Sequence, residues 1–188
     1  MQKAIFLLKE RTYTLLLLIL LLSIGASLAF PEQFPTFQNL QQVLLNVSIE
    51  SIVAIGMMLL MISGMFDLSV GSVAALAGGL TAWLMMSTGI GVVLAVSGGL
   101  LASVLAGLFN GYFISRIGIN PLIQTLATMG MLRGLSLMIS GAGIQNLPYE
   151  FIYIGQSKLL GIQSPIWWMI ILVVVFRYLT TYTTFFRR

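Results

Sequence analysis

Residues 90–115 read IGVVLAVSGGLLASVLAGLFNGYFIS and contain no charged side chain. A helix of this length crosses a bilayer, for which about 20 apolar residues suffice. Small residues recur at every fourth position of the stretch: Gly91, Ala95, Gly99, Ser103, Gly107 and Gly111. Apolar side chains give helices no drive to associate within lipid, so contact depends on small residues that let backbones approach. The stretch therefore predicts a membrane-spanning helix whose small-residue face packs on other helices rather than contacting a substrate.

The rest of the chain has the same character. Of its 188 residues, 59% are hydrophobic and only 7% are charged, whereas a soluble domain carries about 25% charged residues. Six apolar stretches are predicted to span the bilayer: Tyr13–Phe30, Leu44–Met65, Val70–Ser87, Ile90–Ser115, Leu122–Ile139 and Pro165–Tyr182. The third stretch also has small residues at every fourth position: Gly71, Ala75 and Gly79. We predict an all-α, polytopic transmembrane helix bundle of about six spans, forming one domain over residues 1–188.

The distribution of cations predicts the orientation of this bundle. The cations before the first span are Lys3, Lys9 and Arg11, and residues 31–35 after it hold none. The positive-inside rule therefore places the N-terminal segment 1–12 in the cytoplasm. Alternation of the spans then puts the loops 31–42 and 140–164 outside and both termini inside.

A cleaved signal peptide is the alternative interpretation of the first apolar run, since Lys3 precedes its leucine-rich part and the small residues Ser27 and Ala29 lie near its end. The run is about 18 residues long, however, and the apolar region of a signal peptide is usually 7–15 residues. A retained membrane anchor is therefore the prediction.

The composition excludes several kinds of functional site. The chain has no cysteine and no histidine, which removes disulfides, thiolate metal sites and the commonest general base. It also lacks the Gly-rich phosphate loop that ends in Lys-Ser/Thr. The net charge of +4 comes from cations that are scattered or flank apolar segments, a pattern of membrane topology rather than of nucleic-acid binding. We expect no enzyme activity, no metal and no cofactor.

Charged residues inside apolar spans are costly and are functional candidates by default. The candidates are Glu50, Asp67 and Arg133. Arg133 lies too deep in the fifth span to reach water easily, so we predict that it pairs with Glu50 or Asp67. Asp67 and Ser69 precede the third span and are placed to cap its first free amides. A polar lining at a break in the helix is the alternative role of Asp67, and the link that contains it is either a cytoplasmic turn or such a break.

Two amides, Asn110 and Gln124, also lie within apolar spans. Such side chains can hydrogen-bond to a sugar hydroxyl, but hydrogen bonds between helices are their commoner use.

Several motifs together resemble the permease subunits of ribose-type ABC importers, a group that includes importers of xylose, arabinose, galactose, rhamnose and autoinducer-2. The most specific motif is Asp67-Leu-Ser-Val-Gly-Ser72. Gly107-Leu-Phe-Asn-Gly111, Ile119-Asn-Pro-Leu-Ile-Gln-Thr-Leu126 and Met131-Leu-Arg-Gly-Leu135 follow in the same order as in the family. The resemblance covers nearly the whole chain.

The resemblance implies a permease in the bacterial inner membrane that translocates a monosaccharide or a similar hydroxylated molecule. It also implies three protein partners: a cytoplasmic ATP-binding subunit, a periplasmic sugar-binding protein and a second permease copy in a homodimer or heterodimer. The residues at matching positions are Asp67, Ser69, Gly71, Asn110, Pro121, Thr125 and Arg133. We treat Glu50, Asp67, Ser69, Asn110, Thr125 and Arg133 as candidates for the translocation path or a polar network, and Gly71, Gly99, Ser103, Gly107 and Gly111 as helix-packing positions.

The chain also departs from the family. Met65 and Phe66 stand before Asp67 where the family has a glycine and an isoleucine, and family members are considerably longer. The resemblance implies that the cytoplasmic loop contacting the ATPase and roughly the last four spans are missing. A fragment, a truncated product and half of a split subunit are the three interpretations, and a transport-inactive membrane scaffold is the functional alternative.

Overall fold

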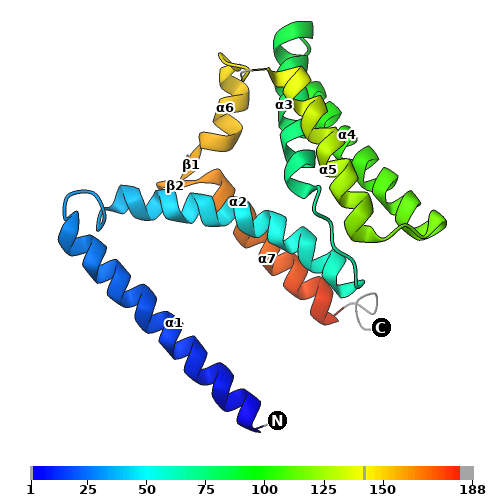
Figure 1. Cartoon of the computed structure of the whole chain (residues 1–188). Coiled ribbons are helices and arrows are strands. Elements are labelled where there is room, and N and C mark those ends of the chain that lie inside the picture. The colour runs from blue at the N-terminus through cyan, green and yellow to red at the C-terminus, as the bar shows by residue number, and fades with distance from the viewer. Residues whose placement is uncertain (1, 142, 183–188) are drawn as a thin grey trace. The chain divides into compact units, whose positions relative to one another are not determined.

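The computed structural model describes residues 2–141 and 143–182, and it is almost entirely helical (Figure 1). The helices are α1 (Gln2–Ala29), α2 (Phe37–Ile62), α3 (Val70–Thr88), α4 (Val92–Tyr112), α5 (Pro121–Ser140), α6 (Tyr149–Gln156) and α7 (Ser164–Tyr182). A π-helical turn, Phe113–Ile117, continues α4. In the described residues, five helices are long and apolar enough to cross a membrane: α2, α3, α4 with its π-helical turn, α5 and α7. The predicted all-α membrane architecture is confirmed.

The first predicted span corresponds to α1, whose apolar part, Tyr13–Ala29, is shorter than the other five. The second predicted span begins later than α2 does. Thr36 accepts a hydrogen bond from the Asn39 backbone amide at 3.2 Å, which is the arrangement of an N-cap. This cap starts α2 at Phe37, so that its glutamine-rich first turns precede the apolar run that begins at Leu44.

The ends of α5 and of the π-helical turn follow from local chemistry. Asn120 caps α5 by accepting a hydrogen bond from the Leu122 amide at 2.9 Å, and Pro121 stands at the first helical position, where its missing amide hydrogen costs nothing. Gly118 ends the π-helical turn with a φ of 82°, a backbone conformation that glycine adopts without steric cost.

The loop predicted outside the membrane, residues 140–164, contains structure that the sequence pattern did not indicate. It holds the short helix α6 and the antiparallel strands β1 (Lys158–Leu159) and β2 (Ile162–Gln163). The two residues between the strands, Leu160 and Gly161, both have positive φ, 54° and 79°. Positive φ at both positions characterises the type I′ turn that favours tight hairpins.

By its backbone contacts the chain divides into two compact units, Met1–Val47 and Ser48–Arg188. The prediction of one domain over residues 1–188 stays a prediction. Within the second unit, α3 packs against α4, which runs antiparallel to it, and against α5, which runs parallel to it (Figure 1). Gly79 of α3 faces Ser136 and Ser140 of α5, and a β-carbon at Gly79 would lie 3.5 Å from the β-carbon of Ser140.

Burial in this chain is the reverse of that in a soluble protein. The buried apolar side chains of the described residues are Leu76, Ala82, Met85, Ala95, Ala106 and Ile166. The buried polar ones are Ser48, Ser69, Ser72, Thr81, Asn110, Gln124, Thr125, Thr128 and Ser136. Large apolar side chains, by contrast, cover the outside of every long helix. This arrangement suits a lipid environment, where polar groups must find their partners within the protein.

Candidate functional site

A cluster of polar side chains joins the start of α3, the end of α4 and the start of α5. It consists of Asp67, Ser69, Asn110, Gln124 and Thr128, and we call it the polar brace. The Ser69 hydroxyl donates to Asp67 Oδ1 at 2.5 Å and accepts from Asn110 Nδ2 at 3.1 Å. Asn110 Oδ1 in turn accepts from Thr128 Oγ1 at 2.6 Å and from Gln124 Nε2 at 3.3 Å. Asn110 is therefore the centre of the cluster, with bonds to both neighbouring helices.

The brace is buried and its hydrogen bonds are satisfied. Asn110 is 4% exposed, Ser69 0% and Thr128 2%. No buried side-chain nitrogen or oxygen of the described residues lacks a hydrogen-bond partner. Since each buried polar atom of the brace has a partner within the protein, the brace links three helix ends. Asn110 and Gln124 form hydrogen bonds between helices here, while contact with a sugar hydroxyl stays a prediction.

The capping prediction for α3 is wrong in its hydrogen bonds, although Ser69 does occupy the N-cap position. No side-chain cap hydrogen bond reaches the first turn of α3. The Ser69 hydroxyl is bonded to Asp67 and Asn110 instead. Asp67, which is half-buried, accepts from the Ser69 amide at 2.7 Å. Asp67 therefore orders the link before the helix, and Ser69 belongs to the brace.

The brace excludes one α5 residue that the sequence selected, Thr125, and includes one that it did not select, Thr128. Thr125 is buried at 1% exposure, but its hydroxyl donates to the Pro121 carbonyl of its own helix at 2.8 Å, so it takes no part in the brace. Thr128 does take part, and the motifs gave no reason to select it. Its spacing of four residues from Gln124, which places both on one helix face, was the available signal.

The predicted ion pair of Arg133 with Glu50 or Asp67 stays a prediction. The Arg133 side chain is exposed on α5. The helix repeat places it on the other side of α5 from the brace. Arg133 is nine residues after Gln124 and is therefore turned from it by about 180°, away from the α3 and α4 side of α5.

The small-residue face of α4 is used over only part of its length. Ala95 and Gly99 are buried, whereas Gly107 and Gly111 are exposed and a β-carbon there would meet nothing within 4 Å. A step of four residues turns a helix by about 40° beyond one full turn, so the series drifts around the helix. Ala106 and Asn110 take over the buried positions toward the end of α4. Ser103 is half-buried and donates to the Gly99 carbonyl at 3.2 Å. As packing positions, Gly71, Gly107 and Gly111 remain predictions.

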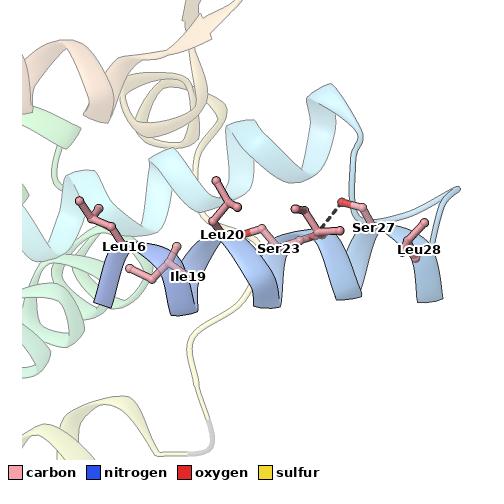
Figure 2. Close-up of a pocket in the computed structure, with 7 residues that line it drawn as sticks. Leu16, Ile19, Leu20, Ser23, Ser27 and Leu28 are labelled. Carbon is pink, nitrogen blue, oxygen red and sulfur yellow. Dashed lines mark hydrogen bonds between the residues drawn. The ribbon is translucent and has the colours of Figure 1, made fainter. Parts of the chain in front are cut away.

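The hollow drawn in Figure 2 lies away from the polar brace. It is lined by Leu16, Ile19, Leu20, Ser23, Ile24, Ser27 and Leu28, all of them on α1. Its Ser27 hydroxyl donates to the Ser23 carbonyl of the same helix at 2.8 Å. A hollow bounded by one helix cannot enclose a ligand, and this one has the character of a lipid-facing surface. No group of three or more potential metal-ligating side chains occurs among the residues that the structure describes.

Comparison with known proteins identifies the family. A family model described as "Branched-chain amino acid transport system / permease component" matches residues 39–186. The chain belongs to this permease family. Its membership and its five long apolar helices make this permease chain a multi-pass integral membrane protein of the bacterial inner membrane.

The curated relatives of this permease chain are components of sugar-type import systems, as the sequence motifs predicted. The L-arabinose transport system permease protein of Escherichia coli (strain K12) is 39% identical over 179 residues, which is 93% of this chain and 53% of the relative. The D-allose transport system permease protein of the same strain is 31% identical over 169 residues, 89% of this chain and 52% of the relative. The autoinducer 2 import system permease protein of Escherichia coli O157:H7 is 32% identical over 183 residues, 97% and 53% respectively.

The permease chain spans about half the length of the curated relatives it matches. No solved structure matches it.

Proposed function

We propose that this chain forms part of the transmembrane channel of an ABC-type importer for a monosaccharide or a similar hydroxylated small molecule. The observation that carries the proposal is the 39% identity to an L-arabinose permease across 93% of this chain. The relatives named for allose and autoinducer 2 match the same region at lower identity, which supports the transport class more strongly than any one substrate.

In this proposal the chain positions helices and performs no bond chemistry. A separate cytoplasmic ATP-binding subunit supplies the energy, and a periplasmic sugar-binding protein delivers the substrate. The polar brace keeps α3, α4 and α5 together while the channel changes its access from one side of the membrane to the other. Asp67, Ser69 and Asn110 then have positioning roles within the brace. The role of Thr125 is to stabilise the first turns of α5 through its bond to the Pro121 carbonyl.

The experiment is an uptake assay in Escherichia coli cells that lack their own L-arabinose permease. The chain is expressed with the host ATP-binding and sugar-binding subunits, with and without the second half of the L-arabinose permease supplied as a separate polypeptide. We expect uptake of labelled L-arabinose in cells that contain this chain and the second half together, at a level at least about tenfold above cells that contain either one alone. Labelled D-allose is measured in parallel to compare substrates.

Membrane fractions are blotted for the tagged chain in every strain, so that failure of expression is not mistaken for failure of transport. A chain that reaches the membrane and associates with the second half but supports uptake of neither sugar would contradict the proposal in favour of a transport-inactive scaffold.

A further inference from the structure

The hairpin between α6 and α7 has two faces of different polarity (Figure 1). Its strands pair with Lys158 opposite Gln163 and with Leu159 opposite Ile162. Successive side chains of a strand point to opposite faces, so one face carries the polar pair and the other face carries the apolar pair. A hairpin with this pattern suits a boundary between water and an apolar phase.

Leu160, in the turn between the strands, is unusual in both conformation and exposure. Its φ of 54° lies in a region that residues other than glycine rarely adopt, and in which asparagine and aspartate are enriched. Its side chain is 84% exposed, and that of Leu159 is 61% exposed. Neither the turn geometry nor packing within the described residues accounts for a leucine at this position. An apolar contact beyond those residues would account for it.

Three hydrogen bonds fix the hairpin and the end of α6 to the first turn of α7. The Trp167 indole nitrogen donates to the Leu159 carbonyl at 3.2 Å. The Ser164 amide donates to the Ser157 carbonyl at 2.9 Å, and the Ser164 hydroxyl donates to the Ile154 carbonyl at 2.7 Å. The position of the hairpin is therefore set by α7, whatever the arrangement of the other long helices.

The start of α7 is also where this span enters the membrane. The helix is long and apolar enough to cross a bilayer, and it begins at Ser164. Tryptophan side chains concentrate at the headgroup level of membranes, and Trp167 and Trp168 stand in the first turns of α7. Trp167 is three residues after Ser164, which is about 4.5 Å along the helix. Its bond to the Leu159 carbonyl therefore places the hairpin at the level of the headgroups.

The short helix α6 carries a second aromatic feature of a membrane interface. Tyr149 and Tyr153 are one helical turn apart, both are exposed, and their ring centroids lie 6.0 Å from each other. Tyrosine is enriched together with tryptophan where a membrane meets water. The segment from α6 to the start of α7 thus presents exposed aromatic rings beside the apolar tip of the hairpin.

We propose that this hairpin rests on the bilayer, with Leu159 and Leu160 inserted among the lipid chains and with Lys158 and Gln163 facing water. Lipid is the occupant of the apolar face because that face is continuous with the surface at which α7 enters the membrane. In the predicted orientation the leaflet concerned is the outer one. The proposal goes beyond the transport function and does not depend on it.

Fluorescence quenching in lipid nanodiscs tests the contact in the complete chain. The chain has no cysteine, so L160C carries a single environment-sensitive fluorophore. Two quenchers are compared: a phospholipid with a nitroxide high on its acyl chain, and iodide in the water. The control is Q145C, since Gln145 is a polar, exposed residue of the same loop. We expect the lipid nitroxide to quench the label at L160C, and iodide to quench it at least about tenfold less than at Q145C, because an ion does not enter hydrocarbon.

Each of the other outcomes overturns the proposal. Quenching at L160C by iodide and not by the lipid nitroxide would show that the hairpin tip stands in water. Protection from both quenchers would show that a protein surface covers the tip, either another part of a permease or a second copy of this chain.

A pair of substitutions at Leu160 tests whether its apolar side chain holds the hairpin in lipid. Asparagine before glycine is a favoured pair in a type I′ turn, so L160N preserves the hairpin while it removes the apolar group. L160M is the matched control, because methionine keeps the apolar character and nearly the volume of leucine.

Both variants are measured with the fluorophore at L159C in the same nanodiscs. We expect L160N to raise iodide quenching at least about threefold, because less apolar surface is then removed from water, and L160M to leave it unchanged. Equal quenching in L160N and L160M would contradict insertion of the leucine. Circular dichroism of each reconstituted variant verifies that its helical content equals that of the unsubstituted chain.

Discussion

Among the glycines of the described residues, Gly99 is the one at which an added β-carbon would make the closest contact. A β-carbon built on it would overlap Thr81 Oγ1 and would lie 2.6 Å from the Ala77 carbonyl oxygen. Thr81 belongs to the same helix as Ala77, and the α3 backbone cannot move away from α4 without disturbing the contacts of both. Position 99 therefore requires a residue without a side chain, because the α4 backbone lies close to the α3 backbone there.

We expect Gly99→Ala to destabilise the chain by about 1–3 kcal/mol, the usual cost of overpacking. Gly107→Ala is the control, because Gly107 lies on the same helix with nothing within 4 Å of the added carbon, and we expect a change within about 0.5 kcal/mol. Unfolding of the purified chains in mixed detergent micelles, followed by circular dichroism, measures both. Equal effects of the two substitutions would show that α3 and α4 do not meet at Gly99.

Among the helices, the polar brace supplies directional contacts that apolar surfaces in lipid cannot. Asn110 of α4 bonds to Ser69 before α3 and to Gln124 and Thr128 of α5. Hydrogen bonds between membrane helices contribute about 0.6 kcal/mol on average and at most about 1.7. Their value here is that they hold the three helix ends in one rotational setting.

Thr128→Val keeps the shape of the side chain but removes the donor to Asn110 Oδ1. We expect it to destabilise the chain by about 0.5–1.5 kcal/mol, because a buried acceptor loses a short bond. Thr125→Val is a matched control on the same helix, since the Thr125 hydroxyl donates to backbone carbonyls of α5.

The same detergent unfolding assay measures both threonine variants. We expect the effect of Thr125→Val to be at most half that of Thr128→Val. A larger effect at Thr125 would mean that the bond within the helix matters more than the brace.

For the molecule as a whole, the predicted orientation has both termini in the cytoplasm. The absence of native cysteine permits single-cysteine labelling with a membrane-impermeant maleimide. In intact cells with a permeable outer membrane, we expect Gln33→Cys and Lys158→Cys to be labelled, since they lie in the predicted outer loops. Arg116→Cys and Asn120→Cys, at the joint between α4 and α5, should be labelled only after the inner membrane is opened.

The reverse labelling pattern would show that the cations near the N-terminus do not orient the chain. Labelling of all four positions in intact cells would indicate that the inner membrane was already open, and the assay includes a cytoplasmic marker protein to recognise this.

The helical spans and the family of this permease could be predicted from the sequence alone. Both depend on short contiguous stretches of residues. An apolar run of about 20 residues must form a helix in hydrocarbon, where each backbone group has to be satisfied within its own segment. The motifs around Asp67, Asn110 and Arg133 likewise lie in short contiguous stretches. The hairpin at Leu160 and Gly161 escaped prediction because only one of its two turn residues is a glycine.

Which polar side chains meet was decided by the tertiary structure. Contact between helices depends on how each is rotated about its axis, and a repeat of 3.6 residues moves a four-residue series steadily around the helix. For this reason the residues at 107 and 111 leave the packed face on which Gly99 lies, and Arg133 faces away from the brace that Gln124 and Thr128 join. The residues 90–115 therefore specified a membrane helix, whereas the arrangement of α3 and α5 around α4 selected Gly99 and Asn110 as the positions on which its packing depends.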